Sequence, residues 1–299
     1  MLTGVQVVLA GGDARQLEVI RKLTELDASV TLVGFEKLQP PPATVVLAEW
    51  VPETLQAADA LVLPAVGTDD QGVIHAIYAD RELRLTDAHL AAMPNHGKVY
   101  TGMAKPYLRR LCEKHRIGLV ELFDRDDVAI YNSIPTAEGA VMMAMQHTDI
   151  TIHGSCCMVL GLGRTGLTLA RTLQGLGATV KVGVRREALF ARAHEMRFEP
   201  FYLDDLVRQA RDVDLLFNTI PTMIVTAQVI AALPPHAVVI DLASQPGGTD
   251  FRYAEKRGIK ALLAPGLPGI VAPKTAGRIM ANSLAQIILE DHRQRGNAP

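Results

Sequence analysis

The six residues Gly161-Leu162-Gly163-Arg164-Thr165-Gly166 carry the clearest chemical signal in this sequence. They follow the apolar run 156–160 and open a helical pattern that continues to Leu176. In such a strand, turn and helix, the first glycine permits the tight turn, the second lets the backbone approach a pyrophosphate, and the third allows close packing of the helix on the strand. The N–H groups and the positive dipole at the helix N-terminus attract phosphate. We therefore expect these six residues to bind a dinucleotide.

The end of the next strand predicts which dinucleotide binds. Residues 178–184 are typical of that strand, and Arg185 and Arg186 follow it directly. An NAD site would place Asp or Glu here to bind the ribose 2′-hydroxyl, but positions 183–186 hold no acidic residue. Guanidinium groups suit a 2′-phosphate instead. We predict NADP, the alternative being that both arginines are the solvated start of the next helix.

Composition limits the other classes of partner. A net charge of −2, from 30 basic and 32 acidic residues, creates no general attraction for nucleic acid or an anionic membrane. The sequence shows no signal-peptide pattern and no apolar run of spanning length, so we expect a cytoplasmic protein. The three cysteines and nine histidines lack the spacing of metal ligands, so we expect no metal site.

Short apolar runs alternate with helical patterns along the chain, which predicts parallel sheets covered by helices. We expect a first α/β domain over residues 1–134, completed by a C-terminal helix over 274–299. A linker helix over 135–150 leads to a six-stranded Rossmann domain over 151–273. The predicted fold class is α/β, with two doubly wound parallel-sheet domains joined by two linker helices. Because ligands bind at the carboxyl ends of parallel strands, both sheets should line an interdomain cleft with those ends.

Loops rich in glycine and proline follow the strands of the second domain. We expect Asn218-Thr219-Ile220 to contact the nicotinamide ribose and Ala243-Ser244 to lie at the carboxamide end. A third loop contains Gly266. The alternative is that these residues only form turns.

The first domain contributes charge at the corresponding positions. Arg15 and Lys105 stand near predicted helix N-termini, where a cation and the helix dipole together favour a carboxylate. For each residue, a surface ion pair is the alternative. The side chains that we predict to bind substrate here, including two from the start of the last helix, are Asp13, Arg15, Thr68, Thr101, Lys274 and Thr275, and Gly266 joins them from the second domain.

The chain resembles the family of the dipicolinate synthase A subunit. That family belongs to a superfamily whose dinucleotide domain resembles that of D-2-hydroxyacid dehydrogenases. The resemblance rests on residues 11–16, 132–139, 161–166 and the tract 241–277, and it extends over essentially the whole chain. The tract is its most specific part, because many dehydrogenases share the glycine turn. From residues 132–139 it adds Ser133 and Thr136 to the predicted substrate-binding side chains.

The resemblance implies a reaction. Dihydrodipicolinate, derived from the hydroxy-tetrahydrodipicolinate of the lysine and diaminopimelate pathway, would be oxidised with NADP to dipicolinate, which spores store. The implied partner is a flavoprotein-like B subunit, and the implied location is the mother-cell cytoplasm. Aromatisation drives such a reaction, so catalysis needs mostly positioning and one proton acceptor.

Glu138 is the predicted base, and Lys105 is the second predicted catalytic residue. An ordinary acid in the first turn of a helix is the alternative for Glu138. We also expect a homo-oligomer.

Two other functions remain open. The chain could be another NAD(P)-dependent small-acid dehydrogenase, similar to alanine or shikimate dehydrogenase, or a cofactor-binding subunit without catalytic activity. Oxidation of a 2-hydroxy acid is disfavoured, because Gln245-Pro246-Gly247-Gly248 follows Ser244 and offers no histidine of the kind that those dehydrogenases use.

Overall fold

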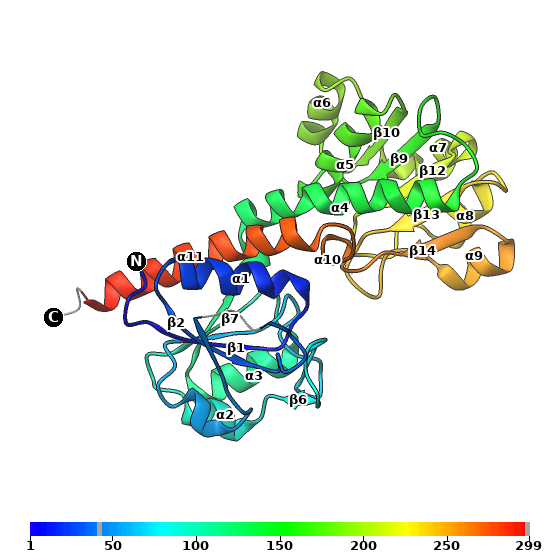
Figure 1. Ribbon diagram of the computed structural model, residues 1–299. Coiled ribbons are helices and arrows are strands. Elements are labelled where there is room, and N and C mark those ends of the chain that lie inside the picture. Colours follow the sequence, from blue (N-terminus) through cyan, green and yellow to red (C-terminus); the bar gives the residue numbers. More distant parts are fainter. Residues whose placement is uncertain (41–43, 297–299) are drawn as a thin grey trace. The chain divides into compact units, whose positions relative to one another are not determined.

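The computed structural model describes residues 1–40 and 44–296 and divides into two compact units (Figure 1). Unit 1 comprises Met1–Val128 and Pro273–Pro299, and unit 2 comprises Ala129–Ala272. Residues 297–299 of the predicted C-terminal helix lie outside the described residues. Each unit has its own sheet and its own buried core.

Unit 1 contains a parallel six-stranded sheet in the order β3-β2-β1-β4-β7-β8. Its strands are β1 (Gln6–Ala10), β2 (Ser29–Val33), β3 (Val45–Leu47), β4 (Ala60–Val62), β7 (Lys98–Thr101) and β8 (Gly118–Glu121). A small antiparallel pair, β5 (Val73–Ile74) and β6 (Leu83–Arg84), lies outside this sheet. The helices are α1 (Ala14–Glu25), α2 (Asp87–Ala92), α3 (Pro106–His115) and α11 (Pro273–Gly296), with short 3₁₀ helices at Pro52–Leu55 and Leu122–Asp124.

Alternating residues of β1 divide the core of unit 1 into two layers. Val7 and Leu9 pack with apolar residues of α1 and α11, whereas Val8 packs on the other face with residues of α2 and α3. This alternation is expected for a central strand covered by helices on both sides.

Helix α11 lies beside α1, although more than 240 residues separate them in the sequence (Figure 1). A Cβ on Gly277 would come within 2.5 Å of the Arg15 carbonyl oxygen, so the glycine permits this close approach. Towards its C-terminus, α11 is anchored to the sheet by Asp291, which binds Lys98 Nζ at 2.6 Å and accepts the Tyr100 hydroxyl at 2.7 Å. Both helices therefore begin at the same end of unit 1.

Unit 2 repeats the architecture with a parallel sheet in the order β11-β10-β9-β12-β13-β14. Its strands are β9 (Cys156–Leu160), β10 (Thr179–Val184), β11 (Glu199–Tyr202), β12 (Leu215–Asn218), β13 (Val238–Asp241) and β14 (Lys260–Leu263). Its helices are α4 (Asp126–His147), α5 (Arg164–Gly175), α6 (Glu187–Glu195), α7 (Leu206–Gln209), α8 (Ala227–Ala232), α9 (Phe251–Arg257) and α10 (Leu267–Val271), with 3₁₀ turns at Leu203–Asp205 and Ala210–Asp212.

The predicted fold class is confirmed, since both sheets are parallel and doubly wound. In each sheet the strand order reverses beside the first strand, at β1/β4 and at β9/β12. Such a reversal point opens a crevice at the carboxyl ends of the strands, where ligands of these folds bind.

The predicted start of the linker helix was wrong. Helix α4 begins at Asp126, and the boundary between the units falls inside it after Val128. Proline usually marks a first turn, which is why Pro135 indicated a start. Here Pro135 lies in the helix interior, and the acidic residues Asp126 and Asp127 occupy the first turn, where the helix dipole favours negative charge.

The three cysteines have structural roles. Burial raises the pKa of Cys112 to about 12 and those of Cys156 and Cys157 to about 11, so these thiols stay protonated at neutral pH. No group of three metal-ligating side chains occurs within residues 1–40 and 44–296. In the same part of the chain, no helix is both long and apolar enough to cross a membrane.

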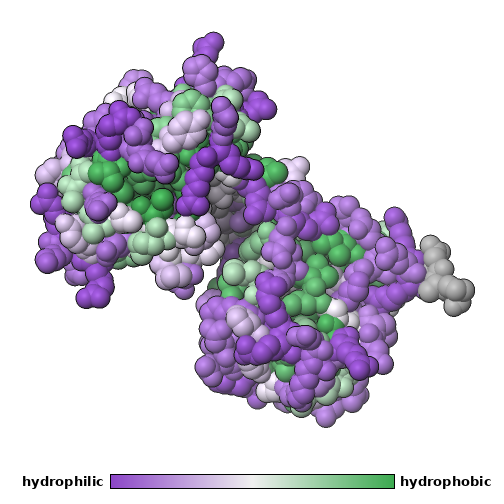
Figure 2. Space-filling view, turned by 180° about the vertical axis from the view of Figure 1, so that it is seen from behind, coloured by the Kyte–Doolittle hydropathy of each residue, from purple (hydrophilic) through white to green (hydrophobic). Residues whose placement is uncertain are grey.

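Figure 2 shows apolar residues exposed on both units, with polar residues around them.

Candidate functional site

The glycine turn after β9 has the geometry of a phosphate-binding turn. Gly161 has a φ of +92°, which favours glycine. A Cβ on Gly166 would collide with the Gly161 carbonyl oxygen, so this glycine lets α5 pack against the turn. A Cβ on Gly163 would meet no atom within 4 Å, which leaves open space above the backbone. These three observations match the three functions of the glycines and fit a bound pyrophosphate.

The remaining residues of the turn support the same site. Leu162 is buried in the core of unit 2, while Arg164 is exposed and Thr165 half-buried in the first turn of α5. The N-cap residue of α5, Gly163, has no side chain and so makes no capping hydrogen bond of its own. The first-turn N–H groups of a helix have no partners within the helix, and phosphate oxygens are suitable acceptors for them.

Arg185 and Arg186 lie directly after β10, the strand next to β9. Both are exposed, and Arg186 precedes the first residue of α6. Within the described part of the chain, neither guanidinium has a hydrogen bond or ion pair. Both cations therefore remain available to an anionic group, and their selectivity for a 2′-phosphate stays a prediction.

The side chains predicted to contact the nicotinamide ribose are bonded to the protein instead. Asn218 is fully buried, and its Nδ2 donates to Asp241 Oδ1 at 3.0 Å and to the Ile220 carbonyl at 3.1 Å. The Thr219 hydroxyl donates to the Leu160 carbonyl at 2.8 Å. These bonds use the donors of both side chains, and their direct contact with the ribose stays a prediction.

The loop after β13, in contrast, contains a hydroxyl that no other described residue uses. Ala243 is buried, and its N–H donates to Asp241 Oδ1 at 3.0 Å. Ser244 is exposed, and its hydroxyl has no bond to another described residue. Ser244 thus stays a candidate for the carboxamide end of the cofactor.

In unit 1, Asp13 and Arg15 form an ion pair at the start of α1. Arg15 Nη2 lies 2.7 Å from Asp13 Oδ2, Nε donates to Oδ1 at 2.9 Å, and the Arg15 backbone N–H donates to Oδ1 at 3.0 Å. Burial of the carboxyl acts to raise the pKa of Asp13, but the hydrogen bonds from Arg15 outweigh it and hold this pKa below its ordinary value. Asp13 therefore caps α1 and orients Arg15.

The other predicted cations of unit 1 have different surroundings. Lys274 and Thr275 are exposed in the first turn of α11, just before Gly277, which packs on Arg15. The structure thus brings Lys274 and Thr275 to the same end of unit 1 as Arg15. Lys105 precedes α3 and lies 3.7 Å from Asp70, in a half-exposed ion pair.

Four predicted substrate-binding hydroxyls are bonded to the protein. Thr101 and Thr68 are buried and donate to the carbonyls of Pro64 and Asp69, at 2.7 and 3.0 Å. Ser133 is also buried, and its hydroxyl lies 2.6 Å from the Thr168 hydroxyl of α5. Thr136 donates to the Asn132 carbonyl one turn earlier, at 2.8 Å. This geometry supports packing roles for the four rather than direct contact with substrate.

Glu138 lies in the middle of α4, so its interpretation as a first-turn acid was wrong. Its side chain is exposed and has no ion pair with another described residue. The next residue, Gly139, packs against Leu267 at the start of α10, where a Cβ would approach Leu267 Cβ to 2.9 Å. Gly266, with a φ of +69°, precedes α10 and follows the carboxyl end of β14. Glu138 therefore lies near the carboxyl edge of the sheet of unit 2.

Sequence reasoning missed two buried polar residues at the sheet edges. Asp241 is fully buried at the end of β13, and Gln16 is 1% exposed beside the end of β4, with Nε2 donating to the Leu63 carbonyl at 3.2 Å. The signal for Asp241 was an acidic residue within an apolar strand. Gln16 carried no comparable signal, since it reads as an ordinary helix residue.

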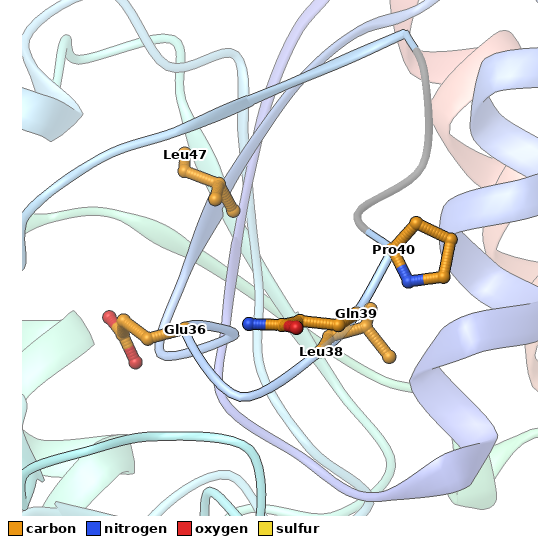
Figure 3. A pocket seen from close by; sticks show the side chains of 5 residues that line it. All are labelled: Glu36, Leu38, Gln39, Pro40 and Leu47. Carbon is orange, nitrogen blue, oxygen red and sulfur yellow. The ribbon is translucent and has the colours of Figure 1, made fainter.

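A cavity of about 550 Å³ in unit 1 lies apart from these residues (Figure 3). Among the residues that the structure describes, it is lined by Glu36, Leu38, Gln39, Pro40 and Leu47, and the charged group among these five is a carboxylate. This lining suits a dicarboxylate poorly.

The sequence matches two families of known proteins. The family of the N-terminal domain of the dipicolinate synthase A subunit matches residues 6–123, and "Alanine dehydrogenase/PNT, C-terminal domain" matches residues 132–297. The dipicolinate synthase A subunit of Bacillus subtilis (strain 168) is 50% identical over 296 residues, which cover 99% of this chain and 100% of the relative.

Solved structures agree with this result. The crystal structure of the dipicolinate synthase A subunit from Bacillus halodurans has a TM-score of 0.94 and 53% identity, covering 96% of this chain and 99% of that one. The corresponding chain from Bacillus subtilis has a TM-score of 0.93 and 50% identity, covering 98% and 99%. A transhydrogenase from Sinorhizobium meliloti, at 16% identity and a TM-score of 0.70 over 94% and 93%, shares the fold. This chain belongs to the family of the dipicolinate synthase A subunit.

Proposed function

We propose that this chain oxidises dihydrodipicolinate to dipicolinate with NADP, as the A subunit of a dipicolinate synthase. The observation that carries the proposal is the 50% identity to the Bacillus subtilis relative along 99% of the chain. The glycine turn supports it, because the open space over Gly163 and the uncapped start of α5 suit a pyrophosphate.

The cofactor follows from the second half of the chain. Its match to the alanine dehydrogenase/PNT C-terminal domain indicates a nicotinamide dinucleotide. Our choice of NADP rests on the guanidinium groups of Arg185 and Arg186 beyond β10, which pair with no other described residue, and on the lack of an acidic residue at positions 183–186.

The proposed reaction makes the ring aromatic by removing a hydride from one ring carbon and a proton from a neighbouring ring atom. When bound, the cofactor supplies the hydride acceptor at nicotinamide C4 and leaves reduced. The protein must then hold a dicarboxylate and accept one proton.

Unit 1 provides the groups for the dicarboxylate. Arg15 uses Nε and Nη2 on Asp13, which leaves Nη1 for a ligand, and Lys274 and Thr275 begin α11 at the same end of the unit. Two helix N-termini add their dipoles to these cations. We propose that these groups bind one carboxylate of the substrate and that Lys105 assists as a third cation.

Glu138 is our candidate for the proton acceptor. Its carboxyl is exposed near the carboxyl edge of unit 2 and has no ion pair with another described residue. A carboxylate of this kind is free to accept a proton from a bound ring.

The word "subunit" in the names of the Bacillus subtilis relative and of the Bacillus halodurans structure implies a partner chain. We propose a flavoprotein-like B subunit that acts with this chain in the mother-cell cytoplasm of a spore-forming bacterium. Homo-oligomerisation stays a prediction that sizing of the purified chain would test.

One experiment tests the proposal. The purified chain is mixed with hydroxy-tetrahydrodipicolinate and NADP, once with the B subunit and once without it. We expect the ultraviolet absorbance of dipicolinate to appear in at least the complete mixture. The variant Glu138→Gln should lower the rate in that mixture while leaving cofactor binding unchanged. A complete mixture that forms no dipicolinate would overturn the proposed function.

A further inference from the structure

We propose that Asp241 is a positioning residue that holds two loops in place for the nicotinamide half of the cofactor. The loops are residues 219–222, which follow Asn218 at the end of β12, and residues 243–249, after β13. The inference rests on the proposed function in placing NADP on this unit, with its pyrophosphate at the glycine turn and its 2′-phosphate at Arg185.

The carboxylate of Asp241 is surrounded by donors. Oδ1 accepts from Asn218 Nδ2 and from the Ala243 N–H, both at 3.0 Å. Oδ2 accepts from the Gly248 N–H at 2.7 Å and from the Thr249 hydroxyl at 2.6 Å. The side chain is 0% exposed, so these four bonds replace its contact with water.

All four donors are electrically neutral. No basic side chain pairs with Asp241 among residues 1–40 and 44–296. A buried carboxylate without a cation is costly unless its lone pairs are filled, so the four donors and the carboxylate stabilise one another. Asn218 ends β12, and the other three donors belong to the loop after β13. Asp241 therefore fixes this loop relative to the point where the loop after β12 begins.

Glycines make the two loops fit together. A Cβ on Gly248 would collide with the Thr222 carbonyl oxygen and would lie 2.6 Å from Asn218 Nδ2. The Ile224 and Val225 N–H groups both donate to the Gly248 carbonyl at 2.9 Å. The loop after β13 therefore packs directly on the segment after β12.

The network extends to the glycine turn. Asn218 Oδ1 accepts the Ile220 N–H at 3.0 Å, which fixes the backbone on both sides of Thr219. The Thr219 hydroxyl reaches the Leu160 carbonyl, and a Cβ on Gly161 would approach that hydroxyl oxygen to 2.7 Å. Asp241 is thus connected through two side chains to the turn that we assign to the pyrophosphate.

The order of strands indicates which half of the cofactor meets these loops. With the pyrophosphate at the turn after β9 and a 2′-phosphate at Arg185 after β10, the adenosine half lies on the β10 side. The nicotinamide half must then extend over the carboxyl ends of β12 and β13, where the loops held by Asp241 begin. Asp241 itself is fully buried and its carboxylate oxygens are bonded to four protein donors, so it acts through the loops.

Asp241→Asn tests this role with a side chain of nearly the same size. Whichever way the amide is turned, its NH₂ group faces two donors, and at least one backbone N–H loses its acceptor. We expect NADPH to bind at least about tenfold more weakly to this variant. A fragment without nicotinamide, 2′-phospho-ADP-ribose, should bind to the variant as it does to the parent chain.

Thr249 provides a second, milder test. Thr249→Val removes one donor to Asp241, and we expect a smaller loss for NADPH alone. Thr249→Ser keeps the hydroxyl and should restore binding. These variants decide the question if Asp241→Asn fails to fold.

Asp214 offers a matched control at the opposite edge of the sheet. It stands just before β12 and accepts the Cys156 backbone N–H at 2.8 Å. Asp214→Asn should therefore leave the affinities for NADPH and for the fragment equal to those of the parent chain.

Calorimetric titration of each variant with both ligands gives the answer. A loss confined to NADPH in Asp241→Asn or Thr249→Val supports the inference. Equal losses for both ligands, or none for either, would overturn it and leave the proposed function standing. A parent chain that binds neither ligand would contradict the cofactor site of the proposed function itself.

Discussion

Arg15 and Asp13 face each other across two contacts, Nη2 to Oδ2 at 2.7 Å and Nε to Oδ1 at 2.9 Å, at the start of α1. Both side chains are largely buried, with 16% and 24% exposure. Paired in this way, the guanidinium is held in one orientation with Nη1 turned away from Asp13. An arginine fixed like this can bind a carboxylate with little further loss of side-chain entropy.

Arg15→Ala should therefore weaken substrate binding. A hydrogen bond to a charged group is worth about 1.5–3 kcal/mol, so we expect the substrate KM to rise by about tenfold or more. The KM for the cofactor should not change, because Arg15 belongs to unit 1 and the glycine turn to unit 2. Steady-state kinetics with each substrate varied in turn would check this, and an unchanged substrate KM would refute the role of Arg15.

The same ion pair predicts how stability depends on pH. The pKa of Asp13 is lowered from its ordinary value of 3.8, so its stabilising contribution is complete above that value and is lost as the pH falls through the lowered pKa. Asp13→Asn keeps an acceptor for the cap of α1 but removes the charge. Urea unfolding should show the parent chain to be more stable than the variant at neutral pH, with the difference shrinking below about pH 4. A difference that is the same at neutral pH and at pH 3 would contradict this account.

Replacing Arg185 tests which of the two nicotinamide cofactors the chain prefers. Arg185→Asp should weaken binding of NADPH by about tenfold or more, because it replaces a cation by an anion beside the 2′-phosphate. Binding of NADH should change much less. Arg211→Asp is a suitable control, since Arg211 is also exposed but precedes β12, at the amino edge of the sheet. Equal losses for NADPH and NADH in Arg185→Asp would show that this arginine does not recognise the 2′-phosphate.

The glycines of the turn predict two different outcomes of the same substitution. A methyl group on Gly163 meets open space, so Gly163→Ala should fold with an unchanged melting temperature and yet bind NADPH more weakly, because the methyl occupies the path of the pyrophosphate. A methyl group on Gly166 collides with the Gly161 carbonyl, so Gly166→Ala should also lose about 1–3 kcal/mol of stability. Thermal unfolding and NADPH titration of both variants would separate the effects. Full NADPH affinity in Gly163→Ala would mean that no phosphate approaches this glycine.

Removing the Ser133 hydroxyl should lower the stability of the protein without changing its enzyme kinetics. Its hydroxyl lies 2.6 Å from both the Thr168 hydroxyl and the Ile130 carbonyl oxygen, so Ser133→Ala should lower the free energy of unfolding by about 1 kcal/mol. The substrate KM should stay the same. A raised KM at unchanged stability would restore the direct contact that the sequence suggested.

The sequence was sufficient for the fold class because the central strands are apolar runs separated by helical patterns. It did not locate the edge strands β3 and β11. Strand β3 is apolar but only three residues long, and its Val46 and Leu47 are 64% and 50% exposed, so it is too short to stand out as a buried strand. Strand β11 contains Pro200, which is unfavourable inside a sheet and typical of an edge strand.

The candidate site was predictable only where the backbone determines it. The backbone geometry at Gly161, Gly163 and Gly166 is that expected of a glycine turn, while the binding of a pyrophosphate there stays a prediction. The hydroxyls of Ser133, Thr68 and Thr101 could not be assigned, because a sequence does not show whether a hydroxyl faces a ligand or a neighbouring carbonyl. Asp241 was missed for the converse reason, since its four donors come together only when two loops fold against each other.

The stoichiometry of the reaction tests the central claim most directly. The purified chain would be mixed with the B subunit, hydroxy-tetrahydrodipicolinate and NADP. The absorbance of dipicolinate and that of the reduced nicotinamide would be recorded simultaneously. We predict that one NADPH forms for each dipicolinate and that both signals fall together in Gly163→Ala. Dipicolinate that forms at the full rate without reduction of NADP would contradict the assignment of this chain as the oxidising subunit.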